Sequence, residues 1–270
     1  MADDREILRE LWDGRIPTSF SLASNEVETL SAPDPYYLML PRQTYLPIAT
    51  EKVRKHFSKH VKVEHQENPM WFEFDGTPLQ WHRPLGVLYD LAVMNSDGEA
   101  RPPWSLVVHF DNYPHQEILR LDSPQAVEMN FMSSIKEADF IKHAGKIIST
   151  MQKKDHLQLW QGLQNDKFDQ FWAVNRRLME RMSGEEGFKA IPVRIYRGDQ
   201  MILQKLYKTI GPERKKRTLQ DLLDEAFPDE DNSDALMVST QGITPPRETP
   251  LQWLSEHLSY PDNFIYLCVK

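Results

Sequence analysis

One pentapeptide occurs twice in this chain of 270 residues, and its two positions constrain the fold more than any other feature. The letters TPLQW stand at residues 77–81 and again at 249–253. Each copy precedes a short helical pattern and a final apolar run that is typical of a strand. Five identical residues at matching positions are improbable by chance. We therefore expect two related units, with Trp81 and Trp253 in equivalent buried positions.

The predicted elements around the first pentapeptide follow a definite order. Alternating apolar residues predict strands in RIPTSFSL and YYLMLPR, and apolar residues at helical spacing predict a helix over 48–61, with Thr50 as its candidate cap. The Asp75-Gly76 turn then joins two short apolar runs, and a short helix leads to a strand at 102–110. The order is strand, strand, helix, strand, helix, strand.

The last third of the chain repeats this order. Its predicted elements are a hairpin, a helix, a strand, a helix and a strand at 190–207, 218–227, 235–240, 249–260 and 263–270. Thr218 and Asp221 have the spacing of a capping box at the start of the first of these helices. A mixed sheet of two hairpins crossed by one helix, with a last strand returning to the middle, is the β-grasp arrangement of ubiquitin. We therefore expect two ubiquitin-like β-grasp domains.

A helix-rich segment separates the two domains. Ser123 is its candidate cap, Pro124 occupies the first helical position, and apolar residues recur at helical spacing through Leu178. A short N-terminal helix over 3–12 opens the chain. The expected fold class is α+β, with two ubiquitin-like domains flanking a helix-rich domain. The expected bounds are 1–13, 14–113, 123–187 and 190–270.

Charge and cysteine content restrict the class of protein. A formal charge of −8 argues against a nucleic-acid-binding protein, because binding to phosphates needs positive potential. The single cysteine, Cys268, excludes an intramolecular disulfide and fits a reducing compartment. The acidic start lacks the apolar core of a secretory signal, and no run reaches the roughly 18 apolar residues of a membrane-spanning helix. We expect a cytoplasmic protein.

The sequence shows no catalytic constellation. It has no HExxH, no paired CxxC and no Gly-rich phosphate loop, so we expect no catalytic residue, cofactor or metal. His56 and His60 could chelate a metal, but on a face shared with lysines they are more typical of solvated side chains. Cys268 lacks a nearby base and is typical of a core residue. The charged run at 213–217 predicts a solvated loop, with contact to an acidic partner or anionic lipids as the alternative.

Lys136 lies in the long helical pattern FMSSIKEADFIKH. Val127, Phe131, Ala138 and Gly145 fall in one narrow sector of the helix at about 100° per residue, and Lys136 points to the opposite side. Four residues are expected to surround it there: Met129, Met132, Phe140 and His143. An apolar patch around a lysine indicates a partner surface. The alternative is a snorkelling lysine whose stem covers the methionines.

Long motifs of the chain resemble the autophagy-related protein five family. They are WDGRIPTSF, PYYLMLPR, WFEFDGTPLQWH, FMSSIKEADFIKH, MQKKDHLQLWQGLQNDKFDQFWAVNRRLME, IPVRIY and ETPLQWLSEHLSYPDNF. The resemblance covers nearly the whole chain and implies the same order of domains. It also implies that Lys136 forms an isopeptide bond with the ubiquitin-like autophagy protein twelve. We expect the nearby Lys142 and Lys146 to point to other sides of the helix and to serve as controls.

The resemblance further implies a scaffold without an active site of its own. In the family, the conjugate and the coiled-coil autophagy protein sixteen act as an E3-like complex. This complex promotes transfer of a ubiquitin-like protein from its conjugating enzyme, autophagy protein three, to phosphatidylethanolamine during autophagosome assembly. A cytoplasmic protein recruited to the phagophore membrane is implied. Family members can carry residues beyond the last strand, whereas this sequence stops at LCVK, so no role for such a tail is transferred. The rival class is an adaptor that binds partners without a covalent step.

The N-terminal helix carries an apolar stripe that is too large for an isolated helix. We expect Ile7, Leu11 and Trp12, with Arg15 beside them, to help form a groove between domains. The groove would receive an amphipathic helix of the coiled-coil partner. Packing of the stripe within the chain itself is the alternative.

Overall fold

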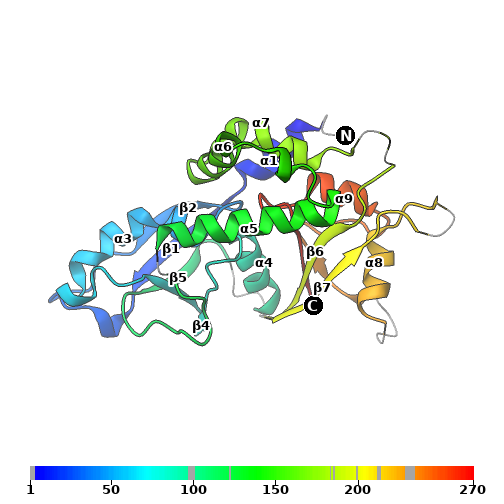
Figure 1. Cartoon of the computed structure of the whole chain (residues 1–270). Helices are drawn as coiled ribbons and strands as arrows, with labels where there is room; N and C mark the ends of the chain where they lie inside the picture. The colour runs from blue at the N-terminus through cyan, green and yellow to red at the C-terminus, as the bar shows by residue number, and fades with distance from the viewer. Residues whose placement is uncertain are drawn as a thin grey trace. The chain divides into compact units, whose positions relative to one another are not determined.

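The computed structural model describes residues 4–96, 101–121, 123–182, 184, 186–198, 200–211, 214–228 and 235–270, and Figure 1 shows their path. Contacts divide the chain into two compact units, one of Gly14–Met129 and one of Met1–Asp13 together with Asn130–Lys270. Three residues that entered the predictions, Asp3, Asp199 and Glu213, lie outside the described residues.

The first unit contains a five-stranded mixed sheet. Its elements are β1 (Arg15–Leu22), β2 (Tyr36–Pro41), α2 (Leu46–Ala49), α3 (Glu51–Phe57), β3 (Trp71–Phe74), β4 (Thr77–Pro78), α4 (Leu85–Asn95) and β5 (Trp104–His109), with short 3-10 helices at Ser24–Glu26, Ser58–His60 and Val63–His65. The strand order is β2-β1-β5-β3-β4. Strand β1 is antiparallel to β2 and parallel to β5, so the first strand lies beside the last, as in the β-grasp fold.

Local sequence signals explain most of these elements. Alternate residues of β1 are buried because its side chains point to opposite faces of the sheet. Asp75 and Gly76 both have positive φ angles, 48° and 74°, which a two-residue hairpin turn requires. Thr50 occupies the N-cap position of α3, as predicted, but its side chain makes no capping hydrogen bond. Its hydroxyl donates to the Leu46 carbonyl at 2.6 Å, because α2 ends there and α3 follows without a break.

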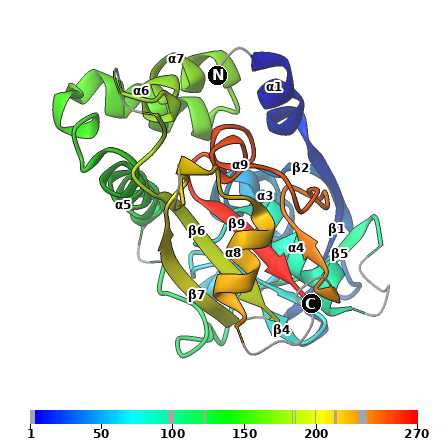
Figure 2. The same cartoon turned by 90° about the vertical axis from the view of Figure 1, so that its right-hand side faces the viewer.

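The second unit contains a four-stranded mixed sheet of the same design. Its elements are β6 (Ile191–Arg197), β7 (Gln200–Tyr207), α8 (Leu219–Ala226), β8 (Val238–Ser239), α9 (Leu251–His257) and β9 (Ile265–Val269). The strand order is β7-β6-β9-β8, and β6 is parallel to β9. Helix α8 crosses one face of the sheet, as Figure 2 shows. The predicted capping box between Thr218 and Asp221 begins this helix.

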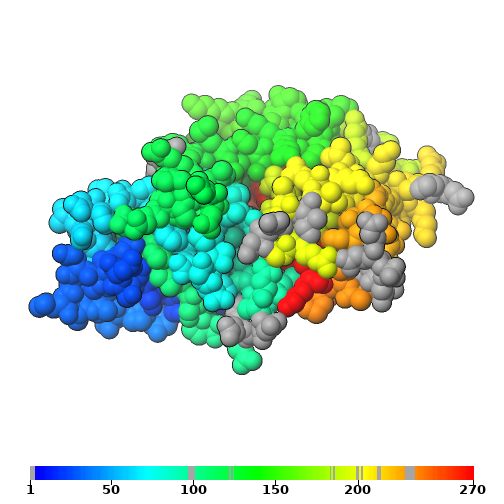
Figure 3. Space-filling view, turned by 90° about the horizontal axis from the view of Figure 1, so that it is seen from below, coloured from blue at the N-terminus to red at the C-terminus, as the bar shows by residue number. Residues whose placement is uncertain are grey.

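Strand β9 lies between β6 and β8 in this sheet. All five of its residues are buried. From below, only a small area of the red C-terminal segment reaches the surface in the space-filling view of Figure 3. Cys268 is 1% exposed within this strand, as expected of a core cysteine. The apolar core of the domain lies between the sheet and the helices α8 and α9.

The two TPLQW segments differ in local structure, so their predicted equivalence is wrong. In the first copy Thr77 and Pro78 form β4, and the segment ends in a turn before α4 begins at Leu85. In the second copy α9 begins directly at Leu251. Trp81 is 7% exposed, whereas Trp253 is half-buried and stacks on His257. The copies share a place in the element order, but the second sheet has no strand that corresponds to β4 among the described residues.

The remaining helices are α1 (Arg5–Asp13), α5 (Pro124–His143), α6 (Lys153–Gln164) and α7 (Phe168–Met179), with a 3-10 helix at Ile148–Thr150. Helix α1 lies beside α7 (Figure 1), and the Trp12 ring lies 5.8 Å from Phe168 and 5.0 Å from Phe171. Helices α6 and α7 approach closely at Gly162. A Cβ there would lie 2.7 Å from the Phe171 backbone, so this contact requires glycine.

Candidate functional site

Helix α5 presents Lys136 on its exposed side. Val127, Phe131 and Ala138 are at most 2% exposed, as their common sector predicts, while Lys136 on the opposite side is exposed. The helix is therefore amphipathic in the predicted sense, and Lys136 lies outside the core.

Several exposed side chains of α5 lie close to Lys136 around the helix. At 100° per residue, Met129, Phe140, Ser133 and Glu137 follow Lys136 within about 100° around the axis. Met129 and Phe140 are each 70% exposed. Along the axis Lys136 lies between these two apolar side chains. Large apolar residues exposed beside a lysine are typical of a surface that binds a protein partner.

Two of the four residues expected around Lys136 are buried instead. Met132 is 9% exposed and His143 is 1% exposed. They lie only about 40° and 20° from Lys136 around the axis, on the other side of it from Met129 and Phe140. His143 contacts the Leu178 carbonyl at 3.5 Å and the edge of the Phe188 ring. Residues of α7 and of the segment before β6 therefore cover His143, which helical spacing alone does not predict.

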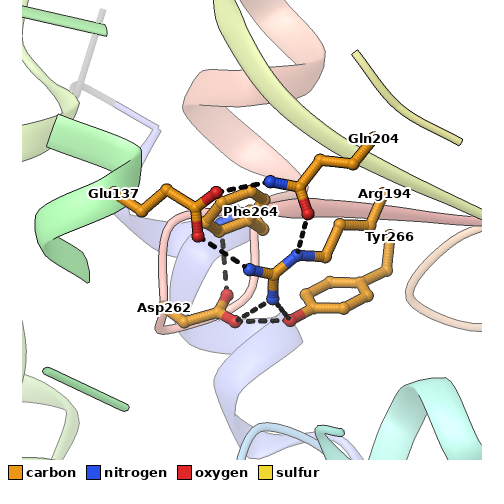
Figure 4. Close-up of polar contacts among 6 residues, drawn as sticks. All are labelled: Glu137, Arg194, Gln204, Asp262, Phe264 and Tyr266. Atoms are coloured by element: carbon orange, nitrogen blue, oxygen red, sulfur yellow. Dashed lines mark hydrogen bonds and ion pairs between the residues drawn. The ribbon is translucent and has the colours of Figure 1, made fainter. Parts of the chain in front are cut away.

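Glu137, the residue after Lys136, connects α5 to the second sheet (Figure 4). One carboxylate oxygen accepts a hydrogen bond from Arg194 Nη2 on β6 at 3.1 Å. The other accepts a hydrogen bond from the Gln204 amide on β7. Gln204 also accepts from Arg194 Nε at 3.2 Å, so the three side chains form a closed ring. Spacing along the chain did not predict this contact, because Glu137 and Arg194 are 57 residues apart.

Arg194 is held in place from its other side as well. Its Nη1 donates to the Tyr266 hydroxyl at 2.8 Å and lies 3.9 Å from Asp262, and its guanidinium carbon lies 3.8 Å from the Phe264 ring centre. The Asp262 carboxylate also accepts from the Tyr266 hydroxyl at 2.5 Å. Burial raises the pKa of Asp262, and the Arg194 charge opposes that rise.

From its position on the helix we expected Lys142 to serve as a control for the substitution of Lys136, but it is buried and does not. It is 1% exposed, its Nζ donates to Met179 Sδ at 3.1 Å, and it lies 4.9 Å from the Phe188 ring centre. Burial lowers its pKa from 10.5 to about 7. Nearby carboxylates oppose this fall, and Glu256 has the largest opposing effect. Helical spacing could have predicted this burial, because Lys142 lies about 20° from buried Phe131 around the helix axis.

The N-terminal residues expected in a partner groove are packed to different degrees. Trp12 is 5% exposed and contacts α7, as the alternative of packing within the chain requires. Leu11 is partly buried against the core of the second ubiquitin-like domain, and Ile7 is half-buried. Arg15 is half-buried and donates to the Gly14 carbonyl at 3.1 Å.

The other candidate groups form no reactive arrangement in the described part of the chain. The His56 and His60 rings lie 6.3 Å apart, and they contact the Asp34 carbonyl and the Thr29 hydroxyl respectively. Among the described residues, no cluster of His, Cys, Asp or Glu has the form of a metal site. In the charged run, Arg214 and Arg217 form ion pairs with acidic residues. The described helices include none with the length and apolarity of a membrane span.

Comparisons with known proteins match the whole length of the chain. Family models described as Autophagy protein ATG5 match as the UblA domain at residues 11–110, the alpha-helical bundle region at 124–181 and the UblB domain at 190–269. Autophagy protein 5 of Drosophila melanogaster is 49% identical over 100% of this chain and 98% of its own length. Autophagy-related protein 5 of Caenorhabditis elegans is 33% identical over 98% and 97%.

A solved structure supports the fold independently of sequence. The crystal structure of Kluyveromyces marxianus Atg5 superposes with a TM-score of 0.81, covering 98% of this chain and 100% of that one. Only 23% of aligned residues are identical, so the likeness is one of fold. Together with the matches to the UblA, helical bundle and UblB models, it confirms the predicted class, in which two ubiquitin-like domains flank a helical region.

Proposed function

This chain belongs to the Autophagy protein 5 family, and on that premise we propose that Lys136 is the covalent acceptor of the ubiquitin-like autophagy protein twelve. The observation that carries the proposal is the exposure of Lys136 in the middle of α5, between the exposed side chains of Met129 and Phe140. The amine is accessible to a second protein, and the apolar side chains offer that protein a place to bind.

The proposed step is an acyl transfer. The unprotonated Lys136 amine attacks the thioester carbonyl that joins the modifier's C-terminal glycine to a cysteine of a conjugating enzyme. A C–N bond forms, the C–S bond breaks, and the departing thiolate takes up the proton that the nitrogen loses. The product is an isopeptide bond. The conjugating enzyme supplies the activated carbonyl, and this chain supplies the amine.

After conjugation the chain acts as a scaffold without an active site of its own. The conjugate, together with the coiled-coil autophagy protein sixteen, works as an E3-like complex. It promotes transfer of a ubiquitin-like protein from autophagy protein three to phosphatidylethanolamine as autophagosomes assemble. The protein is cytoplasmic and is recruited to the phagophore membrane, where direct contact with anionic lipid at residues 214–217 is a secondary part of the proposal.

The N-terminal helix contributes to binding of the coiled-coil partner. Half-buried Ile7 and Leu11 keep apolar surface available, while Trp12 fixes α1 against α7. The partner would dock an amphipathic helix on this surface. A chain lacking residues 1–10 should fold yet bind the partner more weakly, as measured by isothermal titration calorimetry. Unchanged affinity would show that α1 has a structural role instead.

Substituting Lys136→Arg tests the acceptor directly. In growing cells the wild-type chain should migrate well above its own 31.7 kDa, as a species that survives heat, detergent and thiol reductant. Lys136→Arg should remove that species, because a guanidinium with a pKa above about 12 does not act as the attacking amine. Stability should change by less than about 0.5 kcal/mol, since the site is exposed.

The matched control is Lys146→Arg, an exposed lysine just beyond α5, which should conjugate normally. A slow species that persists in Lys136→Arg would show that another lysine is the acceptor. No slow species in the wild type would favour the plain adaptor.

A further inference from the structure

A ring of polar side chains, formed by Glu137, Arg194 and Gln204, joins α5 to the second sheet (Figure 4). A glutamate that is 43% exposed on a helix surface is normally solvated and conformationally free. Here each carboxylate oxygen has a separate donor, Arg194 from β6 and Gln204 from β7. Attachment at two points opposes both rotation of α5 about its axis and sliding of α5 along the sheet.

The attachment point on the sheet is itself rigid. The Arg194 side chain is 16% exposed, and its guanidinium is held by the Tyr266 hydroxyl, the buried Asp262 and the Phe264 ring. A planar guanidinium with this many fixed contacts has little freedom to follow a moving carboxylate. Glu137 is therefore bound to a group that the fold of the second domain already positions.

Lys136 is the neighbour of this bound residue. The two residues are consecutive in the helix, which corresponds to a rise of about 1.5 Å and a rotation of about 100° between them. The hydrogen bonds of Glu137 with Arg194 and Gln204 form a tether between α5 and the sheet. If α5 rotates about its axis, the Cα–Cβ bond of Lys136 turns by the same angle, so a tether that limits this rotation also limits the movement of the lysine. Attack on a carbonyl carbon requires the reacting atoms within about 3–3.5 Å in a defined direction, and a displacement of about 1 Å can reduce a rate by 10²-fold.

We propose that Glu137 is a positioning residue for conjugation, whose carboxylate, bound to Arg194 and Gln204, fixes the helix face that delivers Lys136 to the thioester. The inference rests on the proposed function of Lys136. A role as general base is disfavoured by geometry, because both oxygens of Glu137 already accept hydrogen bonds from donors on the sheet.

The test is a reconstituted conjugation reaction with the full-length chain, the modifier, and its activating and conjugating enzymes. Initial rates are measured against acceptor concentration for the wild type, Glu137→Ala and Glu137→Asp. Aspartate keeps the charge but is one methylene too short to reach both donors. In both variants the rate at saturating acceptor should fall by about tenfold. The acceptor concentration at half-maximal rate should change by less than about twofold, because a positioning defect acts after binding.

Matched controls separate this role from stability and from charge. Glu180→Ala removes another exposed carboxylate of the same unit and should leave the rate unchanged. The thermal midpoint of Glu137→Ala should fall by no more than about 4 °C, because a half-exposed ion pair contributes little to stability. Amide hydrogen exchange in α5 should accelerate in both Glu137 variants and stay unchanged in Glu180→Ala.

Three outcomes would overturn the inference. A wild-type saturating rate in Glu137→Asp would show that charge near Lys136 matters and the tether does not. A raised half-saturating concentration with an unchanged saturating rate would make Glu137 part of a docking surface. A wild-type rate in Glu137→Ala would remove any role. In each case the proposed function would stand if the wild-type chain formed a conjugate and Lys136→Arg did not. If the wild-type chain formed no conjugate, both the proposed function and the role of Glu137 would be overturned.

Discussion

Replacing the buried Lys142 with methionine should stabilise the protein and remove a defined part of its pH dependence. Lys142 is 1% exposed, and its ammonium donates to the weakly accepting Met179 sulfur. Burial lowers its pKa from 10.5 to about 7, even though the carboxylates of Glu256, Asp262 and Asp139 favour the charged form. The folded protein therefore disfavours the charged form of Lys142 relative to the unfolded chain, in which the ammonium is hydrated.

The direction of the pH effect follows from proton binding. Between pH of about 7 and 10.5 the unfolded chain holds a proton on Lys142 that the folded chain has lost. The free energy of unfolding therefore rises with pH across this window, by up to about 1.4 kcal/mol per pH unit. At 1.36 kcal/mol per pKa unit, a fall from 10.5 to about 7 corresponds to about 5 kcal/mol of destabilisation at pH 6. About 2 kcal/mol of it remains at pH 9.

The assay is urea unfolding of the wild type and Lys142→Met at pH 6 and pH 9. Methionine has a similar length and no charge, so packing effects on the difference between the two proteins cancel between the two pH values. The advantage of Lys142→Met should shrink by about 3 kcal/mol from pH 6 to pH 9. Lys146→Met, at an exposed position, is the control and should change stability by less than about 0.5 kcal/mol at both pH values.

Two results would refute this reasoning. If the difference between Lys142→Met and the wild type were equal at pH 6 and pH 9, Lys142 would not titrate in the expected window. If Lys142→Met were less stable than the wild type at pH 6, the contacts of the ammonium with Met179 and the Phe188 ring would outweigh its desolvation.

Two further substitutions test the packing of the helical region. Trp12→Ala should destabilise the second unit by about 3–5 kcal/mol in urea unfolding, because it removes a buried ring that contacts Phe168 and Phe171; a loss below about 1 kcal/mol would mean that α1 is only loosely docked. Gly162→Ala should destabilise by about 1–3 kcal/mol despite the higher helix propensity of alanine, because the new Cβ would meet the Phe171 backbone at 2.7 Å. A rise in thermal midpoint for Gly162→Ala would show that α6 and α7 can separate without loss.

The predicted strands and turns agree closely with the structure where their signals are local. RIPTSFSL was predicted as a strand and coincides with β1, because alternation of apolar residues depends only on neighbours along the chain. The Asp75-Gly76 turn and the capping box at Thr218 are likewise set by the chemistry of two or three adjacent residues. The repeated order of elements then determined the pairing of first and last strands in both sheets.

The pentapeptide shows where identity of sequence is insufficient. TPLQW forms a strand and a turn in one copy and begins a helix in the other. The first copy pairs with β3, whereas the second follows a loop that leads directly into α9. Five residues carry weak intrinsic preferences, so the surrounding sheet decides their conformation.

For the candidate site, the sequence determined the direction of each side chain and the tertiary structure decided what covers it. Helical spacing correctly placed Lys136 opposite the core, but it did not distinguish exposed Met129 from buried Met132. The ring between Glu137 and Arg194 depends on contacts across 57 residues, and no local pattern encodes such contacts. Periodicity is a property of one helix, whereas burial and ion pairing depend on which other elements pack against it.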